Sequence, residues 1–276
     1  MRGVLIELAN VAGRIAREHF AHIGLKDAIV KADRDYVSHV DRQIERELIA
    51  RIRNRFPDHR VLGEEGGGDA IGELGDGPCW IIDPIDGTAN FLHGIPAFAI
   101  SIAYCDAKVD PRHAIVHDPI RQESFIGERG AGVWLNERRV WTSGCSEMSK
   151  ALIATGLPFR VIEPLDDALR VFADLQRRCE DHRRAGSAAL DLAYVAVGRL
   201  DAYWELGIHP WDTAAGELLV RCGGGAATDF RGDAGGLAGR RSMVAAATPA
   251  LQREILAAMA PLVPWLDRAP YRDGSV

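Results

Sequence analysis

The segment Trp80–Phe91, with the sequence WIIDPIDGTANF, most constrains how this chain can fold. It opens with an apolar run that predicts a buried strand, and the side chains of a regular strand alternate between its two faces. Asp83 and Asp86 are three residues apart, so an unbroken strand cannot point both carboxylates to one side. Pro84 fixes its own φ and favours an extended Asp83. We therefore expect the strand to end at Ile82 in a tight turn.

Such a turn brings both carboxylates and the main-chain carbonyl of Ile85 to one point. Oxygen ligands with no nearby cysteine or histidine are typical of Mg²⁺ or Mn²⁺ and not of zinc. Gly87 and Thr88 follow at the start of an expected helix, where main-chain N–H groups can hold a phosphate. The segment alone also fits a plain capped helix with Asp86 as its N-cap.

Three further blocks stand in order around this segment: YVSHVD at 36–41, GEEG at 63–66 and WDTAAG at 211–216. Together the four blocks resemble the inositol monophosphatase family, and the resemblance is colinear from about Asp35 to Gly225. It implies an α/β (α+β) fold, a layered α-β-α-β-α sandwich of the sugar-phosphatase type. It also implies an inositol-phosphate phosphatase that hydrolyses a small phosphomonoester by direct attack of a metal-activated water.

The resemblance assigns the acidic residues to a metal site. It implies about two to three Mg²⁺ ions, with Mn²⁺ as a substitute. The implied metal ligands are Glu64, Asp83, Ile85 through its carbonyl, Asp86 and Asp212. Glu64, Thr88 and Asp41 would orient and deprotonate the water, and Asp41 also fits an N-cap or helix-dipole role. Carboxylates about 4 Å apart repel by about 1–4 kcal/mol per pair, and bound cations offset that repulsion.

The implied substrate is a small phosphorylated polyol, most simply inositol 1-phosphate. The implied substrate-binding residues are Asp86, Gly87, Thr88, Arg183, Gly186, Ser187, Ala188, Glu205 and Asp212. For Arg183 the alternatives are a contact with the partner of a dimer or an ordinary surface residue, and for Glu205 the alternative is a structural salt bridge. Three departures from the family pattern (Ala89, Ala97 and His117) leave the preferred substrate open. Fructose-1,6-bisphosphatase, or another small phosphomonoesterase of the superfamily, is therefore an alternative.

A role of another class must also be considered. Some bacterial members of the resembled family are non-catalytic partners in ribosomal RNA transcription complexes. The formal net charge of −6 argues against direct binding of nucleic acid, because such surfaces are basic. A protein partner in such a complex therefore stays open. The resemblance also implies a homodimer and inhibition by lithium.

Composition sets the remaining expectations. Five widely spaced cysteines without a C-x-x-C motif indicate reduced thiols in the cytoplasm. Glu7 and Asn10 come too early for a signal peptide, and no apolar run approaches the ~20 residues of a membrane helix. We expect two subdomains: residues 1–150 with most metal ligands, and 151–276 with Asp212 and the contacts to substrate hydroxyls.

Hydrophobic periodicity places the elements. Helices are predicted at 3–22, 40–56, 164–178, 188–197, 211–222 and 249–259. Strands are predicted at 28–31, 60–63, 80–82, 98–104, 114–117, 123–127, 132–135, 151–155, 201–205 and 243–247. Ser187 is the expected N-cap of its helix. The glycine-rich stretch 66–77 is expected to be a mobile loop that bound metal orders. His93, His117 and His209 are expected to be structural.

Overall fold

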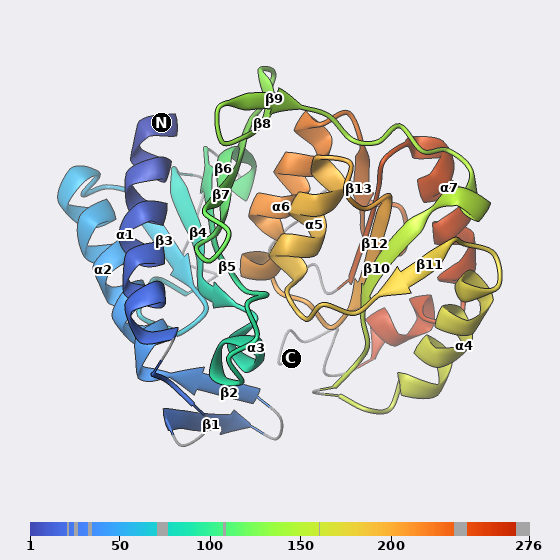
Figure 1. Cartoon of the computed structure of the whole chain (residues 1–276), viewed down its shortest axis with the longest axis horizontal. Coiled ribbons are helices and arrows are strands. Elements are labelled where there is room, and N and C mark those ends of the chain that lie inside the picture. The colour runs from blue at the N-terminus through green and yellow to red at the C-terminus, as the bar shows by residue number, and fades with distance from the viewer. Residues whose placement is uncertain are drawn as a thin grey trace.

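The computed structural model describes residues 1–20, 22–24, 27–32, 35–70, 77–106, 109–159, 161–234 and 242–268. Helices and sheets alternate across the molecule in five layers (Figure 1). Two sheets are separated by one pair of helices, and each sheet carries another pair on its outer face. The predicted α-β-α-β-α sandwich is confirmed.

The first outer layer and the larger sheet share one core. Helices α1 (Arg2–Phe20) and α2 (His39–Arg55) bury apolar side chains such as Leu5 and Leu48 against it, in a core that they share with Trp80 of the sheet. The sheet has the order β3-β4-β5-β6-β7-β8-β9, and all neighbours are antiparallel except β3 and β4. Its strands are β3 (Arg60–Gly63), β4 (Cys79–Asp86), β5 (Ala99–Cys105), β6 (Pro111–Asp118), β7 (Glu123–Glu128), β8 (Gly132–Leu135) and β9 (Arg138–Val140).

The central layer consists of α5 (Ala188–Ala196) and α6 (Pro210–Cys222), which lie between the two sheets (Figure 1). Both helices are buried along most of their length, because a helix covered by sheets on two sides is apolar on more than one face. A side chain on Gly216 would come within 2.4 Å of Leu192, so this glycine allows α5 and α6 to approach closely. These helices tie the two sheets into one core.

The smaller sheet is mixed, with the order β11-β10-β12-β14-β13. Its strands are β10 (Leu152–Gly156), β11 (Asp181–Arg183), β12 (Ala202–Leu206), β13 (Ala226–Thr228) and β14 (Ser242–Ala246). Helices α4 (Leu165–Gln176) and α7 (Pro249–Ala258) cover its outer face through a third core that includes Trp204 and Val244. Two 3₁₀ helices complete this half, η4 (Met148–Lys150) and η6 (Val263–Asp267).

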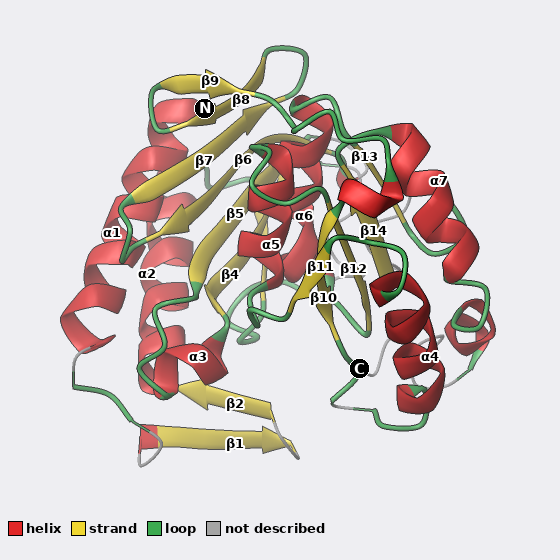
Figure 2. Cartoon of the chain, turned by 45° about the vertical axis from the view of Figure 1, so that its right-hand side comes forward, coloured by secondary structure: helices red, strands yellow, loops and turns green. Residues whose placement is uncertain are grey.

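A small hairpin and a short helix stand apart from the layers. Strands β1 (Ala28–Ala32) and β2 (Asp35–Ser38) pair with each other, and α3 (Thr88–Leu92) lies beside β2 (Figure 2). Among the described residues, no helix is long and apolar enough to span a membrane. The predicted boundary at residue 150 falls between the two sheets, and the independence of the two halves stays a prediction.

Strand β4 corrects one prediction. It does not end at Ile82, because its ladder with β5 continues to Asp86. The register is interrupted between Asp83, which pairs with Ser101, and Asp86, which pairs with Ala99. Between these two pairs the chain advances three residues on β4 but only two on β5, which is a β-bulge. The extra residue in β4 changes which face of the sheet the following side chains point to. The bulge, and not a turn after Ile82, brings the two carboxylates to one side.

Other differences are smaller. Apart from the hairpin at 135–140, which the family resemblance implies, strands β2, β11 and β13 were not predicted, since each has only three or four residues and depends on its neighbour for pairing. The predicted glycine-rich loop is described only in part, because residues 71–76 lie outside the described ranges. Its first part is held against β3, where the Asp69 carboxylate accepts from the Val61 N–H at 2.7 Å.

Candidate active site

A cavity of about 240 Å³ lies where β4 ends and where α3, α5 and α6 begin. It is lined by residues from both halves of the chain. The predicted site residues among them are Glu64, Asp83, Ile85, Asp86, Gly87, Thr88, Gly186, Ser187, Ala188, Glu205 and Asp212. Segments more than a hundred residues apart in the sequence therefore line one cavity.

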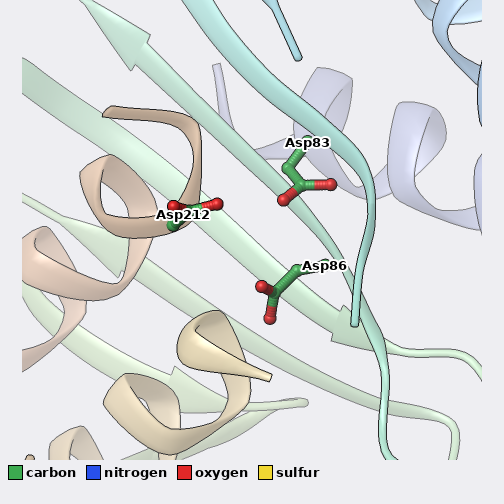
Figure 3. A group of neighbouring side chains, drawn as sticks. All are labelled: Asp83, Asp86 and Asp212. Atoms are coloured by element: carbon green, nitrogen blue, oxygen red, sulfur yellow. The ribbon is translucent and has the colours of Figure 1, made fainter. Parts of the chain in front are cut away.

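Three carboxylates converge in this cavity (Figure 3). Asp83, Asp86 and Asp212 each offer an oxygen, and these oxygens lie within 4.8 Å of one another. Burial and the neighbouring carboxylates of Glu64, Asp86 and Asp212 raise the pKa of Asp83 well above its usual range. Burial and the charge of Asp212 raise the pKa of Asp86 to about 8. Acidic groups are thus held close together, and two of the three, Asp83 and Asp86, are buried.

Main-chain and hydroxyl donors hold each of the three carboxylates in place. Asp83 accepts from the Ile85 N–H at 3.0 Å, and Asp212 accepts from the His209 N–H at 2.6 Å. Asp86 accepts from the Ala189 N–H at 2.9 Å and from the Ser187 hydroxyl, both at Oδ2. These bonds fix the position of each of the three carboxylates on the cavity wall.

Glu64 is held at the end of β3 by a residue that the sequence analysis did not identify. Glu45 is buried on α2, and its carboxylate accepts from the N–H groups of Glu65 at 2.8 Å and Gly67 at 2.7 Å. A side chain on Gly63 would come within 2.3 Å of a Glu45 oxygen. The sequence feature that could have identified Glu45 is a carboxylate next to Ile44, on the apolar face of the predicted helix.

Thr88 and Asp41 make the predicted contact. The Thr88 hydroxyl lies 2.9 Å from the Asp41 carboxylate and 3.1 Å from the Ile85 carbonyl. Asp41 is not the N-cap of α2, because Ser38 takes that position and Asp41 completes a capping box with it. Burial raises the pKa of Asp41. Its carboxylate is therefore fixed by the helix start and directed to Thr88.

The loop before α5 closes another side of the cavity. The Asn90 side-chain amide donates to the carbonyls of Ala97 at 2.7 Å and Ala185 at 2.8 Å, which ties this loop to α3. Gly186 has a φ of 85°, a conformation that favours glycine. Ser187 is the N-cap of α5, as predicted, and its hydroxyl accepts from the Leu190 N–H.

Glu205 enters the cavity from β12. It lies opposite Gly156 of β10, where a side chain would meet the Glu205 carboxyl carbon at 2.0 Å. The Tyr203 hydroxyl donates to the same carboxylate. Burial and the charge of Glu205 raise the pKa of Tyr203 well above its usual range. The absence of a side chain at Gly156 thus makes room for the Glu205 carboxylate.

Arg183 is the one predicted substrate-binding residue that does not line the cavity. It is exposed at the end of β11, and its guanidinium pairs with Asp181 at 2.5 Å. The next residue, Arg184, lines the cavity instead, because successive side chains of an extended segment point to opposite sides. The prediction of a basic residue here was therefore one position off.

The three histidines lie outside the cavity lining. His93 is exposed, and the buried His117 ring contacts the Ser124 hydroxyl at 2.9 Å. His209 is the N-cap of α6 and stacks on Trp211 with ring centroids 4.6 Å apart. Their placement agrees with structural roles.

The donor set fits a hard divalent cation. Among the described residues, Asp83, Asp86 and Asp212 are the one group of histidine, cysteine or acidic side chains whose ligand atoms converge in this way. All their donors are oxygens, which Mg²⁺ prefers. Their mutual repulsion would be relieved by a bound cation, so the cluster can hold a metal.

Comparisons with known proteins agree with this geometry. The family model described as "Inositol monophosphatase family" matches residues 1–263. The chain is 45% identical over 236 residues to a Nus factor SuhB of Pseudomonas aeruginosa, covering 84% of this chain and 86% of that protein. A crystal structure of the extragenic suppressor protein suhB from Bartonella henselae superposes with a TM-score of 0.85 at 34% identity, covering 94% of this chain and 97% of that one. An IMPase of Thermotoga maritima gives a TM-score of 0.83 at 31% identity, over 95% and 97%.

Proposed function

The chain belongs to the inositol monophosphatase family, and from that membership we propose that it is a Mg²⁺-dependent phosphomonoesterase acting on small phosphorylated polyols. Inositol 1-phosphate is the proposed substrate. The observation that carries the proposal is the convergence of three carboxylates within 4.8 Å beside the Thr88–Asp41 contact. That combination supplies a cation site and a proton acceptor on one cavity wall.

The proposed metal-holding residues are Glu64, Asp83, Asp86, Asp212 and the carbonyl of Ile85. When bound, Mg²⁺ would acidify a water and neutralise charge on the phosphate and on the leaving oxygen. Asp83, Asp86 and Asp212 would keep the cations in place, since each carboxylate is anchored by a main-chain or hydroxyl donor. Glu45 supports Glu64 by fixing the backbone of the residues that follow it.

Thr88 and Asp41 are the proposed proton acceptors. When the Thr88 hydroxyl donates to Asp41, its oxygen can accept a hydrogen bond from the attacking water. Water aligned in this way can pass its proton to the carboxylate, aided by Glu64. The buried capping box keeps Asp41 from turning away, so the pair is ready before substrate arrives.

Substrate contacts are proposed on the remaining walls. The N–H groups of Gly87 and Thr88 would hold the phosphate. A side chain on Gly87 would come within 3.1 Å of two carbonyl oxygens, which supports close packing of this turn. Glu205, the Ala188 N–H and the Asp86 carboxylate would receive the polyol hydroxyls. Gly186 and Ser187 would shape the wall between them.

The test is phosphate release from a panel of substrates with Mg²⁺. Inositol 1-phosphate should be hydrolysed faster than fructose 1,6-bisphosphate, 3′-phosphoadenosine 5′-phosphate, NADP and histidinol phosphate. A chelator should stop the reaction, and Mg²⁺ or Mn²⁺ should restore it. Preference for fructose 1,6-bisphosphate would move the assignment to the alternative substrate class. A protein that binds Mg²⁺ but hydrolyses none of the panel would contradict the proposal.

A second function is supported by a specific observation. The similar Pseudomonas aeruginosa protein is named as a Nus factor, and proteins of the same name from other bacteria share about the same coverage. We propose that this chain also acts as a non-catalytic protein partner in a bacterial rRNA transcription complex. Folded Asp212→Asn protein should then rescue a deletion strain, whereas failure to rescue would tie the phenotype to catalysis.

Three further properties follow from the same family membership as proposals. Lithium should inhibit phosphate release. The protein should be a homodimer, which analytical ultracentrifugation measures. It should be found in the cytoplasmic fraction of its cell.

A further inference from the structure

Asp191 is a buried carboxylate in the cavity that the proposed chemistry does not use. It lies in the first turn of α5, only 3% of its surface is exposed, and it lines the cavity. Among the described residues, no side chain or main-chain group makes a hydrogen bond or ion pair with its carboxylate. Buried acids almost always have a partner, so an unpartnered one needs an explanation.

The start of α5 does not supply that partner. The Leu190 N–H is bonded to the Ser187 hydroxyl and the Ala189 N–H to Asp86. The N–H of Asp191 itself donates to the Ser187 carbonyl. An acid in the first turn of a helix is normally stabilised by such N–H groups, but these three donate to other acceptors. The carboxylate of Asp191 therefore faces the cavity without compensation from its own helix.

The charged groups around Asp191 also leave it unsatisfied. Burial raises its pKa well above the usual range, and the nearby carboxylates of Glu205 and Asp86 raise that pKa further. Arg184 acts in the opposite direction, but its side chain is exposed at the cavity wall. No cation site is formed here, because among the described residues the acids that converge within 4.8 Å are Asp83, Asp86 and Asp212.

We propose that Asp191 binds substrate together with Glu205, and that the two carboxylates accept hydrogen bonds from neighbouring free hydroxyls of a polyol. The inference rests on the proposed function and specifies its substrate class. A carboxylate accepts hydrogen bonds and cannot donate them when ionised, so hydroxyl donors suit it. A second phosphate at this end would face two like charges. The pair thus selects a polyol monophosphate and disfavours a bisphosphate.

Two variants test the assignment, Asp191→Asn, which keeps the shape, and Asp191→Ala, which removes the acceptor. Each is compared on inositol 1-phosphate and on p-nitrophenyl phosphate, which has no hydroxyls. For inositol 1-phosphate, kcat/KM should fall about 10-fold in the first variant and about 30-fold in the second. For p-nitrophenyl phosphate it should stay within about twofold. Activity on fructose 1,6-bisphosphate should rise relative to inositol 1-phosphate.

Thermal unfolding separates a binding role from a structural one. If the carboxyl group is kept for substrate, its removal relieves an unpartnered buried acid and raises Tm, by roughly 2–4 °C for a protein of this size. Asp166→Asn is the matched control, since Asp166 is an exposed acid in the first turn of α4. That control should leave the kinetic ratio unchanged and should not raise Tm.

Each other outcome overturns the inference in a recognisable way. Equal losses on both substrates with a lower Tm would make Asp191 a structural residue. Unchanged kinetics on both substrates would remove it from substrate binding. Wild-type protein that hydrolyses p-nitrophenyl phosphate but no polyol phosphate would keep the phosphatase and reject the substrate class. Wild-type protein that hydrolyses neither would reject the proposed function itself.

Discussion

Buried carboxylates are held in opposite ways in two regions of this molecule. At the turn between β6 and β7, the fully buried Asp118 accepts from the N–H groups of Ile120 at 2.9 Å and Arg121 at 2.8 Å. The Arg121 guanidinium also donates to it at 2.8 Å and continues to the Pro96 carbonyl at 2.9 Å. Four consecutive residues thus contain the acid, its hydrogen-bond donors and its counter-charge.

The cavity shows the reverse arrangement. Asp83 is as buried as Asp118, with 1% of its surface exposed, but the charges that shift its pKa are those of Glu64, Asp86 and Asp212. A buried charge is costly unless it is paired, so the chain tolerates this cluster only because other interactions stabilise the fold. Asp118 is therefore stabilised by groups of the chain itself, whereas Asp83 lies among like charges that a bound cation would neutralise.

The largest expected effect comes from Asp212→Asn. Loss of one cation ligand should lower kcat/KM by roughly a thousandfold or more, because bound metal contributes several kcal/mol to transition-state stabilisation. The same change removes one of four like charges, so Tm in chelator should rise. Mg²⁺ should then stabilise the variant less than the wild type, since stabilisation by a ligand follows its affinity. Differential scanning calorimetry with and without Mg²⁺ measures both shifts.

The opposite response is expected at the β6–β7 turn. Asp118→Ala removes the acceptor of two main-chain N–H groups and the partner of Arg121. The free energy of unfolding should fall by about 2–3 kcal/mol, with or without Mg²⁺. Activity below the unfolding transition should be unchanged, because Asp118 does not line the cavity. Urea denaturation measures this decrease in the free energy of unfolding. A decrease that depends on Mg²⁺ would contradict the distinction between Asp118 and the cavity carboxylates.

Glu45 combines features of Asp118 and Asp83. Its carboxylate accepts from main-chain N–H groups, as that of Asp118 does, but those N–H groups belong to the segment that follows the cavity residue Glu64. Glu45→Gln leaves one acceptor oxygen for two N–H groups, so the backbone after Glu64 should loosen. Mg²⁺ affinity, measured by titration calorimetry, should fall about 10- to 30-fold, and stability by about 1–2 kcal/mol. Glu47→Gln is the control, since Glu47 is exposed on the same helix and pairs with Arg51. Equal effects of both variants would remove Glu45 from the support of the site.

The sequence predicted those parts of the site that follow from local chemistry. Asp83 and Asp86 stand in one strand, and Ser187 has the residue type of an N-cap. The bulge in β4 could not be read from the segment, because it depends on which residues of β5 lie opposite. The predicted turn would have brought the two carboxylates together as well, so a wrong local structure led to the right contact.

Residues whose role depends on tertiary neighbours were missed. Asp191 has the sequence pattern of an ordinary first-turn acid, and only the structure shows that the helix donors are committed elsewhere. Arg184 was confused with Arg183 because the short strand β11 sets which of the two faces the cavity. The roles of Asp191 and Arg184 depend on where their side chains point in the fold, and composition and sequence spacing do not determine that direction.

His182 tests whether an unpartnered buried atom always marks a functional site. His182 of β11 is away from the cavity, and its Nδ1 contacts the Gln176 side-chain oxygen at 2.9 Å. Its Nε2 is buried and, among the described residues, has no hydrogen-bond partner. Burial lowers the pKa of His182 to about 4 from its usual 6.5. Protonation would place an unpartnered N–H and a charge in the protein interior.

The sign of the pH effect follows from that shift. Between pH 6.5 and 4 the unfolded chain binds the proton and the folded chain does not. Stability is therefore complete above pH 6.5 and is lost as the pH falls towards 4. The slope stays below about 1.4 kcal/mol per pH unit, because the ring is partly exposed and solvent screens its charge. Urea denaturation over this pH range should show that the free energy of unfolding falls less steeply with decreasing pH in His182→Gln than in wild type. The exposed control His93→Gln should show the same pH dependence as wild type. Reduced phosphatase activity in His182→Gln at pH 7 would instead connect this buried ring to the cavity, and an unpartnered atom would then mark function in both places.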